Sequence, residues 1–457
     1  TYYIYFSGYG SEKLEDKEVK YDAPIGMMPN IEKEGYTFYG WKNEHGEYFM
    51  SDTIWRKLNN QTVSPDLRAN QYTITYNGNG GTTSKASQTV EYDKVINSLA
   101  TAYLEGYTFN GWNTYADGSG ETIAAPYTYN ISDDITLYAQ YTANQYNVTF
   151  DKQGGSGGSE GVNATYGSQM PTGTDVVAPT KSGYTFQGYF SMPRGAGTKY
   201  YNNDMSGTRN WDLLDDTTLF AYWIANQYRV TFDKQGGSGG TSSIVVTYNI
   251  EMPSGGSITA PKKTGYIFQG YYQSKNGQGI KYYNSDMTSR NVWREASNSI
   301  IYAYWTPDTY TVVLQKEGGT GGSDSIQVMY QSSMPSATAP TRVGYTFQGY
   351  YSEPNGLGTK YYDENMSSAH DWDIAADQTL YAYWTGNTYT VTFNKQGGTG
   401  GSYSIKVTYG SPMPSNVSAP TRTHYVLKGF YEQPNGVGTK YYDGPDMTSV
   451  YVWDRLG

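Results

Sequence analysis

Short runs of alternating apolar and polar residues recur along the chain, separated by stretches rich in glycine and proline. In residues 146–150, Tyr146, Val148 and Phe150 fall on one face. Such alternation predicts a β-strand with one buried face. A glycine-dense stretch follows, and residues 162–166 form a second run of the same kind. Two strands joined in this way predict a β-hairpin with an irregular loop.

The same segment predicts three further strands. Residues 184–190 form the third and residues 199–201 a short fourth. Residues 218–223 are apolar or aromatic on both faces, which predicts a strand at the centre of a sheet. Between the last two, residues 204–211 are expected to form one helical turn with Asp204 as its N-cap.

This pattern repeats. The segment Gly-Tyr-x-Phe-x-Gly occurs five times, and a degraded sixth copy begins at His424, at intervals of 71, 77, 82, 79 and 80 residues. A period this regular indicates one small domain copied in tandem. We therefore divide the chain into six repeats: 1–69, 70–143, 144–225, 226–307, 308–386 and 387–457. The first is the most divergent, with residues 66–69 as a shortened remnant of the last strand. The sixth is expected to lack its last strand.

Composition supports a mainly β protein with aromatic cores. Apolar residues make up 37% of the chain, but it contains 51 Tyr, 13 Phe and 10 Trp, and 54 Gly. Aromatic rings bury large areas and keep a polar group at one end. The net charge of −10 and the lack of a basic stripe argue against nucleic acid as a partner. Without cysteine, the chain has no disulfide, thiolate nucleophile or Cys-bound zinc.

Other sequence features bear on location. No run of 18 apolar residues is present, so we expect no membrane insertion in this chain. We find no signal peptide or anchor motif, and the chain begins at Thr1 without Met. It is therefore expected to be a mature form or a fragment of something longer.

Candidate catalytic and metal-binding groups are weak. The glycine-rich residues 77–83 resemble a phosphate loop, but a strand rather than a helix follows them. His45, His370 and His424 lie far apart, and no acidic run has the spacing of a Ca²⁺ loop. No pair of carboxylates stands out for glycoside hydrolysis. We expect no enzyme activity, no cofactor and no metal.

A lysine follows the first strand in four repeats, and surface proteins can crosslink such a lysine to asparagine. That reaction requires a buried lysine beside a carboxylate, whereas a lysine flanked by glycines is expected to be solvated. The lysines are Lys152, Lys234, Lys316 and Lys395.

Paired tyrosines are the main candidates for contacts. Neighbouring residues in a strand face opposite ways, so one ring of each pair is expected to be buried and the other exposed. An exposed ring could stack on a sugar, bind a protein partner or pack against the next repeat. The candidates are Tyr200, Tyr201, Tyr282, Tyr283, Tyr361, Tyr362, Tyr441 and Tyr442.

The order of motifs is itself informative. The fifth repeat contains Met334-Pro335, then Ala339-Pro340-Thr341-Arg342, then the glycine–tyrosine segment from Gly344, and finally Leu380-Tyr381-Ala382-Tyr383-Trp384. This order resembles the Listeria–Bacteroides repeat, also called the internalin B-type B repeat. The resemblance implies a small β-grasp, ubiquitin-like domain of α+β type, used in tandem in secreted, wall-bound bacterial proteins. A small immunoglobulin-like β-sandwich is the alternative. The family has no catalytic residues to transfer.

These observations predict a non-catalytic, extracellular tandem array on a bacterial cell surface or cell wall. Short joints such as residues 224–227 should limit bending, so we expect a semi-rigid, extended stalk or adhesin segment. The alternative is a multivalent array that binds carbohydrate or protein through exposed tyrosines. Expected partners are glycans or proteins of a host or neighbouring cell, and self-association is a further option.

Overall fold

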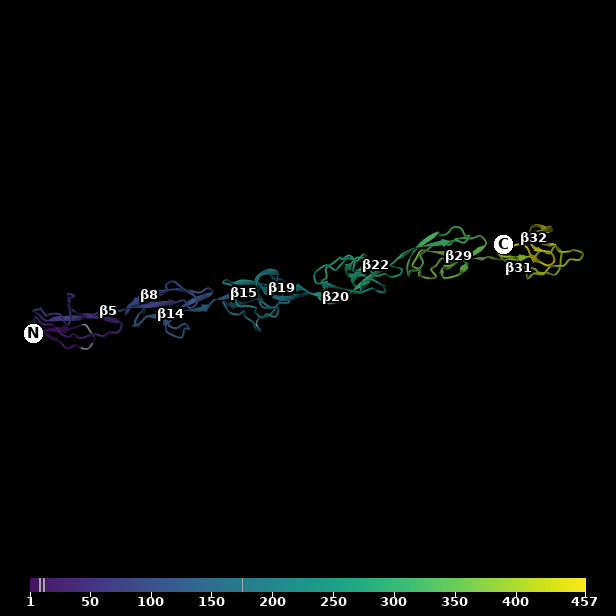
Figure 1. Cartoon of the computed structure of the whole chain (residues 1–457). Coiled ribbons are helices and arrows are strands. Elements are labelled where there is room, and N and C mark those ends of the chain that lie inside the picture. Colours follow the sequence, from purple (N-terminus) through teal and green to yellow (C-terminus); the bar gives the residue numbers. More distant parts are fainter. Residues whose placement is uncertain (8–9, 11–12, 175) are drawn as a thin grey trace. The chain divides into compact units, whose positions relative to one another are not determined.

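The computed structural model describes residues 1–7, 10, 13–174 and 176–457. The chain divides into two compact parts, Thr1–Ile224 and Ala225–Gly457, and each is described by itself. Their regular secondary structure is almost all β-strand, which confirms the predicted mainly β class (Figure 1). Among the described residues, no helix has the length and apolar composition needed to span a membrane.

The third repeat shows the common plan. Its five strands lie in the order β16-β15-β19-β17-β18. The first and last strands, β15 and β19, pair in parallel at the centre, and Figure 1 shows them together. The first two strands form the predicted antiparallel hairpin. The bounds are β15 Gln145–Asp151, β16 Gly161–Thr165, β17 Tyr184–Phe190, β18 Lys199–Tyr201 and β19 Thr217–Ala225.

The fourth and fifth repeats have the same strand order, with the last strand parallel to the first and antiparallel to the third. The fourth contains β20 Gln227–Asp233, β21 Ser243–Thr247, β22 Tyr266–Ser274, β23 Gln278–Tyr283 and β24 Ser299–Pro307. The fifth contains β25 Thr309–Gln315, β26 Ser325–Met329, β27 Tyr345–Tyr351, β28 Lys360–Tyr362 and β29 Gln378–Gly386.

Helical turns lie elsewhere than the sequence indicated. A short 3₁₀ turn follows the third strand in repeats 3 to 6: η1 Pro193–Gly195, η2 Lys275–Gly277, η3 Pro354–Gly356 and η4 Pro434–Gly436. The helical turn expected over residues 204–211 is wrong. The Asp204 carboxylate accepts a hydrogen bond from the Ser206 backbone N–H at 2.9 Å, and Met205 has φ 64°. This geometry makes a tight turn that a helix cannot continue.

The first repeat has the same order, β2-β1-β5-β3-β4, and the expected shortening of its last strand is also wrong. β5 spans Gln61–Ala69, nine residues, as β19 does. The apolar pattern did not predict the full length of the strand because a charged residue, Asp66, lies within it. Asp66 is buried, and the Lys42 amine contacts its carboxylate at 2.8 Å. The other strands are β1 Tyr2–Phe6, β2 Lys17–Val19, β3 Tyr36–Lys42 and β4 Tyr48–Phe49.

The second repeat adds two small two-stranded pairs to the five-stranded plan, β7 with β10 and β9 with β13. Its main strands are β6 Gln71–Asn77, β8 Ser87–Glu91, β11 Tyr107–Asn113, β12 Thr122–Ile123 and β14 Ile135–Ala143. The small ones are β7 Thr82–Thr83, β9 Val95–Ile96, β10 Ala102–Tyr103 and β13 Tyr127–Thr128.

The sixth repeat has a divided sheet. β30 Thr388–Thr392 pairs with β31 Ser404–Thr408, and a separate sheet contains β32 Gly429–Gln433, β33 Val437–Asp443 and β34 Thr448–Ser449. In the sheets of the other repeats, the last strand lies between the first and the third strand. Among the described residues of the sixth repeat, no strand takes this place in the sheet between β30 and β32.

Each repeat has its own core, and aromatic rings dominate it. In the third repeat Val148, Tyr189, Trp211 and Leu219 are completely buried. The Phe150 and Tyr189 rings stack with their centroids 4.3 Å apart. Rings of this size let a sheet with so few aliphatic residues bury enough apolar surface.

Candidate functional site

The paired tyrosines are core residues, so the expectation that one ring of each pair is exposed is wrong. All eight candidates are at most 6% exposed. The Tyr201 hydroxyl donates to the Pro171 carbonyl at 2.7 Å, on the core side. The Tyr200 ring packs against Trp211 at 5.2 Å. The segment carrying Trp211 therefore covers the second face of this edge strand. The two rings point to opposite faces, but both faces are buried.

In most of these pairs, the hydroxyl of the first tyrosine donates a hydrogen bond to an aspartate carboxylate. The hydroxyls of Tyr200 and Tyr361 donate to Asp212 and Asp373, at 2.6 and 2.5 Å. The fourth repeat departs from this pattern, because Arg294 follows its core tryptophan. The Tyr282 hydroxyl is buried there without a hydrogen-bond partner among the described residues. Burial raises the pKa of Tyr282 to about 12.

The feature shared by neighbouring repeats is the joint between them. Within the two parts, one residue separates the last strand of a repeat from the first strand of the next. Its backbone N–H donates to the carbonyl of a glycine in the preceding repeat, at 2.9 Å in each case, and we call this glycine the joint glycine. Its carbonyl accepts from the N–H of a tyrosine in the following repeat, at 2.9 to 3.0 Å. The sets are Gly35, Asn70 and Tyr92; Gly106, Asn144 and Tyr166; Gly265, Asp308 and Tyr330; Gly344, Asn387 and Tyr409.

The joint glycine begins the Gly-Tyr-x-Phe-x-Gly segment and lies under that tyrosine ring. A Cβ added at Gly344 would be 2.4 Å from the ring of Tyr409, and one at Gly106 would be 2.2 Å from that of Tyr166. Gly344 and Gly106 have φ values of 78° and 79°. Glycine is therefore needed at this position for two reasons: it adopts the left-handed backbone conformation without strain, and it leaves space for the ring.

Further contacts reinforce the joints, and the joint between the fifth and sixth repeats has all of them. The tyrosine after the joint glycine meets the partner ring edge-on, as Tyr345 meets Tyr409 with centroids 5.4 Å apart. The Arg342 guanidinium lies over Tyr345 at 4.0 Å. The Thr346 hydroxyl donates to the Asn387 side chain at 2.6 Å. A cation, two rings and a side-chain hydrogen bond thus hold two repeats together over a single linking residue.

Three positions depart from this pattern. At the joint between the fourth and fifth repeats, Ile267 and Asp308 take the places of the threonine and asparagine, so both members of that hydrogen bond change together. In the sixth repeat His424 replaces the joint glycine and adopts φ 69°. The sequence pattern predicted a strand in the glycine–tyrosine segment and marked the repeat, but it predicted no contact of this segment with the next repeat. The signal it missed was a tyrosine that recurs just after the second strand.

The loop lysines are not solvated as expected. The Lys152 side chain is 14% exposed, and its amine contacts the Glu160 carboxylate at 2.5 Å and the Gly158 carbonyl at 3.5 Å. The Glu160 side chain is 89% exposed, so this is not the buried pair that an isopeptide crosslink requires. The lysine instead holds the glycine-rich loop closed. Lys234 and Lys395 contact the loop carbonyls of Gly240 and Gly401.

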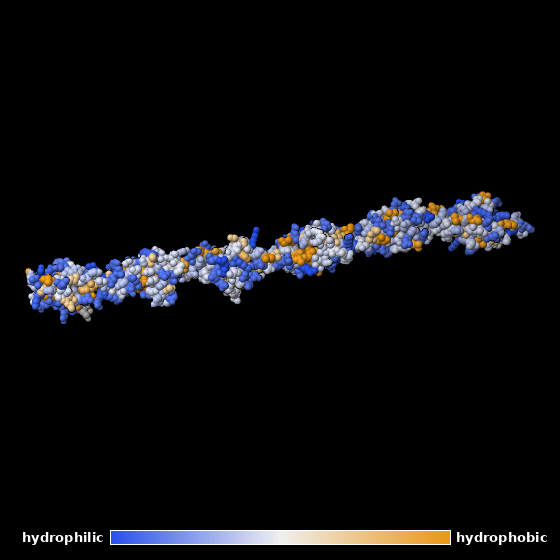
Figure 2. All heavy atoms as spheres, in the orientation of Figure 1, coloured by the Kyte–Doolittle hydropathy of each residue, from blue (hydrophilic) through white to orange (hydrophobic). Residues whose placement is uncertain are grey.

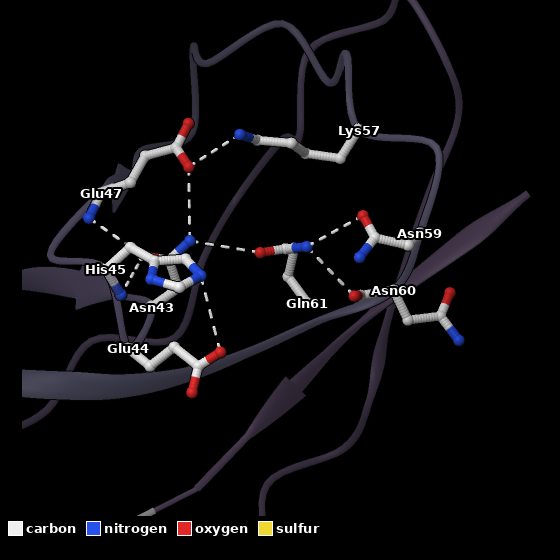
Figure 3. A network of polar contacts seen from close by, with 8 residues as sticks. All are labelled: Asn43, Glu44, His45, Glu47, Lys57, Asn59, Asn60 and Gln61. Atoms are coloured by element: carbon white, nitrogen blue, oxygen red, sulfur yellow. Dashed lines mark hydrogen bonds and ion pairs between the residues drawn. The ribbon is translucent and has the colours of Figure 1, made fainter.

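A polar network in the first repeat lies beside a cavity of about 500 Å³ (Figure 3). The Asn43 carbonyl oxygen accepts from the backbone N–H groups of His45 and Glu47, at 3.1 and 3.0 Å. Its amide nitrogen donates to Gln61 and Glu47, and Lys57 pairs with Glu47 at 2.8 Å. These groups satisfy one another, so the network shapes a loop. Among the described residues, no three His, Asp or Glu side chains gather as metal ligands would.

The surface lacks a continuous apolar face in the view of Figure 2, where hydrophobic residues form small separate groups. The paired tyrosines themselves are buried, so they do not supply exposed rings for a binding site.

Known proteins show the same repeat. A family model described as the Listeria–Bacteroides repeat domain matches residues 2–55, 72–140, 146–221, 228–296, 310–383 and 389–451. A putative Gly-rich membrane protein of Evansella cellulosilytica is 29% identical over 82% of this chain and 41% of its own length. Internalin H of Listeria monocytogenes is 33% identical over 35% of this chain and 26% of its own length. The chain thus spans less than half the length of these relatives.

Proposed function

Because the chain belongs to the Listeria–Bacteroides repeat family, we propose that it is a non-catalytic, semi-rigid stalk segment of an extracellular bacterial surface protein. This family occurs in bacterial surface proteins, and the relatives are described as membrane proteins and an internalin. The observation that carries the proposal is the recurring joint, because a stalk requires resistance to bending between its units.

We further propose that each repeat is a β-grasp domain in which a loop takes the place of the usual helix. The strand order with a parallel central pair supports this over a sandwich, because a sandwich requires two facing sheets. In the third repeat, the segment bearing Met205 and Trp211 packs across the sheet where a helix would lie.

The stiffness of the joints explains how such a segment would act. A flexible linker of many residues lets neighbouring domains reorient freely. Here one residue links two strands, and a buried glycine, two aromatic rings and two backbone hydrogen bonds fix its orientation. Repeats coupled in this way share stability with their neighbours.

Small-angle X-ray scattering of the full chain tests the proposal against its alternative. If the chain is a stalk, its scattering profile should be fitted by a narrow set of molecular shapes. The profile of the double variant Gly265→Ala/Gly344→Ala should then require a broader set of shapes. A glycan array screened with the same protein tests the binding array. Specific glycan binding that the Gly265→Ala/Gly344→Ala variant retains would show that adhesion, rather than spacing, is the main role.

A further inference from the structure

The path of the chain through a repeat determines which bonds a pull on its two ends loads. In the fifth repeat the chain enters through β25 and leaves through β29, and these two strands pair in parallel. Since both strands run in the same direction, the start of β25 and the end of β29 lie at opposite ends of the pair. A stretching force therefore draws the two strands past each other along their length.

Shear of this kind loads the bonds between the two strands together. Their register begins with Val312 beside Gln378 and ends with Gln315 beside Tyr381. In a parallel pair the hydrogen bonds are evenly spaced along the strands, so a sliding force strains them as a set. A pull on the open end of an antiparallel hairpin instead breaks one pair after another. Because forced unfolding depends on the rate of the slowest step, breaking several bonds at once makes the repeat resistant.

Two side-chain hydrogen bonds extend this strand pair, one at each end. Asp377, just before β29, accepts from the N–H of Thr311 in β25 at 2.8 Å. At the other end, the Trp384 indole N–H donates to the Lys316 carbonyl at 3.0 Å. Both bonds join the last strand or the residue before it to the first strand or the residue after it. A shearing force must therefore break these two bonds as well.

The third and fourth repeats have the same arrangement. Their first and last strands pair in parallel in the same register, Val148 beside Thr217 and Val230 beside Ser299. An Asp or Asn side chain before the last strand accepts from the first strand, and a tryptophan indole donates to a lysine carbonyl after the first strand. The bonds, at 2.8 to 2.9 Å, are Asn147 N–H to Asp216 and Trp223 to Lys152 in the third repeat, and Arg229 N–H to Asn298 and Trp305 to Lys234 in the fourth.

The joints pass a force from one repeat to the next without slack. Asp308 alone separates β24 from β25, and Asn387 alone separates β29 from β30. A flexible linker of many residues would extend before the domains on either side were loaded. Here the last strand of one repeat leads directly into the first strand of the next, so the force arrives at the ends of the parallel pair.

We propose that the third to fifth repeats bear tension, and that the parallel pair of first and last strands with its two side-chain hydrogen bonds is a mechanical clamp. A repeat held in this way stays folded while its ends are pulled apart, which is the load on a surface protein whose far end is held. The clamp goes beyond the proposed stalk. Resistance to bending depends on the joints between repeats, whereas resistance to stretching depends on bonds within each repeat.

Pulling the fifth repeat within the full chain in two directions tests the clamp. The chain has no cysteine, so introduced cysteine pairs define where force is applied. Thr309→Cys with Thr388→Cys, both at exposed positions, loads β25 and β29 in shear. Thr309→Cys with Met329→Cys is the control, because these register partners lie at the open end of the hairpin of β25 and β26. At equal loading rate, we expect unfolding in shear to require at least about twice the force.

Variants of the shear pair test whether the resistance comes from the clamp. Asp377→Ala removes the hydrogen bond to Thr311, and the lifetime of the fifth repeat at constant force should fall about fivefold, as expected for one lost hydrogen bond. Tyr361→Phe is the matched control, because the bond it removes, from Tyr361 to Asp373, does not join the two strands. It should leave this lifetime nearly unchanged. Release of roughly 250 Å of chain identifies the unfolding of the repeat.

Equal unfolding forces in the two pulling directions would overturn the proposal. Equal effects of Asp377→Ala and Tyr361→Phe on the lifetime under force would overturn it too. The outcome is separate from that of the stalk, because only the fifth repeat is loaded. High resistance in shear together with freely bending joints supports the clamp and refutes the stalk, whereas low resistance together with stiff joints refutes the clamp alone.

Discussion

Replacing the joint glycine Gly344 by alanine should loosen the contact between the fifth and sixth repeats. The change has two costs. Alanine at φ 78° carries about 1–2 kcal/mol of left-handed strain. Its Cβ would also lie 2.4 Å from the Tyr409 ring, so that ring must move. Moving it sacrifices an edge-to-face pair worth about 0.5–1.5 kcal/mol and weakens backbone hydrogen bonds worth about 1 kcal/mol each. We expect joint opening to become about 2–4 kcal/mol easier.

Two amides report this opening directly. The Asn387 N–H bonds to the Gly344 carbonyl, and the Tyr409 N–H bonds to the Asn387 carbonyl. Since 1.4 kcal/mol corresponds to a factor of ten, their exchange should accelerate by roughly 30- to 1000-fold in the full chain. Gly400→Ala is the matched control, because Gly400 has φ 70° and no atom within 4 Å of an added Cβ. It should strain its own loop and leave both reporter amides nearly unchanged.

A double variant separates strain from collision. In a Tyr409→Ala background the ring is gone, so adding Gly344→Ala should cost only the backbone strain, about 1–2 kcal/mol. If Gly344→Ala and Gly400→Ala accelerated the two reporter amides equally, the packing of Gly344 under Tyr409 would not hold the joint, and the reasoning would be refuted.

Four further variants or titrations address other contacts. Arg294→Asp should give the Tyr282 hydroxyl an acceptor and stabilise the fourth repeat by about 1 kcal/mol, measured by urea unfolding; no gain would contradict the Tyr–Asp pairing. Hydrogen bonds from Lys42 and Tyr48 lower the pKa of Asp66 from 3.8 to about 2, so this carboxylate stabilises the first repeat above pH 4 and the effect is lost as pH falls through 2. Asp66→Asn should remove about 2 kcal/mol of that pH dependence in thermal unfolding. His424→Gly should relieve left-handed strain and raise the stability of the sixth repeat by about 1 kcal/mol, seen as slower exchange in β30. Burial raises the pKa of Tyr350 and Tyr362 to about 12, so folding is favoured below pH 10 and loses this contribution as pH rises through 12; tyrosinate absorbance of these rings should appear only with unfolding.

The fold was predictable where the residues of a single strand determine its place in the sheet. Residues 218–223 are apolar on both faces, and β19 indeed lies at the centre of its sheet. The hairpin of β15 and β16 followed from alternation and a glycine-rich loop. Both predictions use information within a few residues. The family resemblance was also confirmed, because it rests on the order of several motifs along the chain.

The errors arose where a distant segment decides the outcome. Alternation predicts opposite faces for Tyr200 and Tyr201 correctly, but it cannot show that the segment around Trp211 covers the second face. The joint glycine reads in sequence only as the start of a strand, because the ring that packs over it belongs to the following repeat. For Gly35 that ring belongs to Tyr92, more than fifty residues away, and a single repeat contains no trace of the contact.

The distribution of distances between two spin labels across one joint tests the central claim most directly. The chain has no cysteine, so cysteines at Thr231 and Val313, exposed positions on the first strands of the fourth and fifth repeats, can be labelled without side reactions. The proposed stalk predicts a narrow distance distribution in the parent chain that becomes broad in Gly265→Ala. A broad distribution in the parent, unchanged by that substitution, would contradict it.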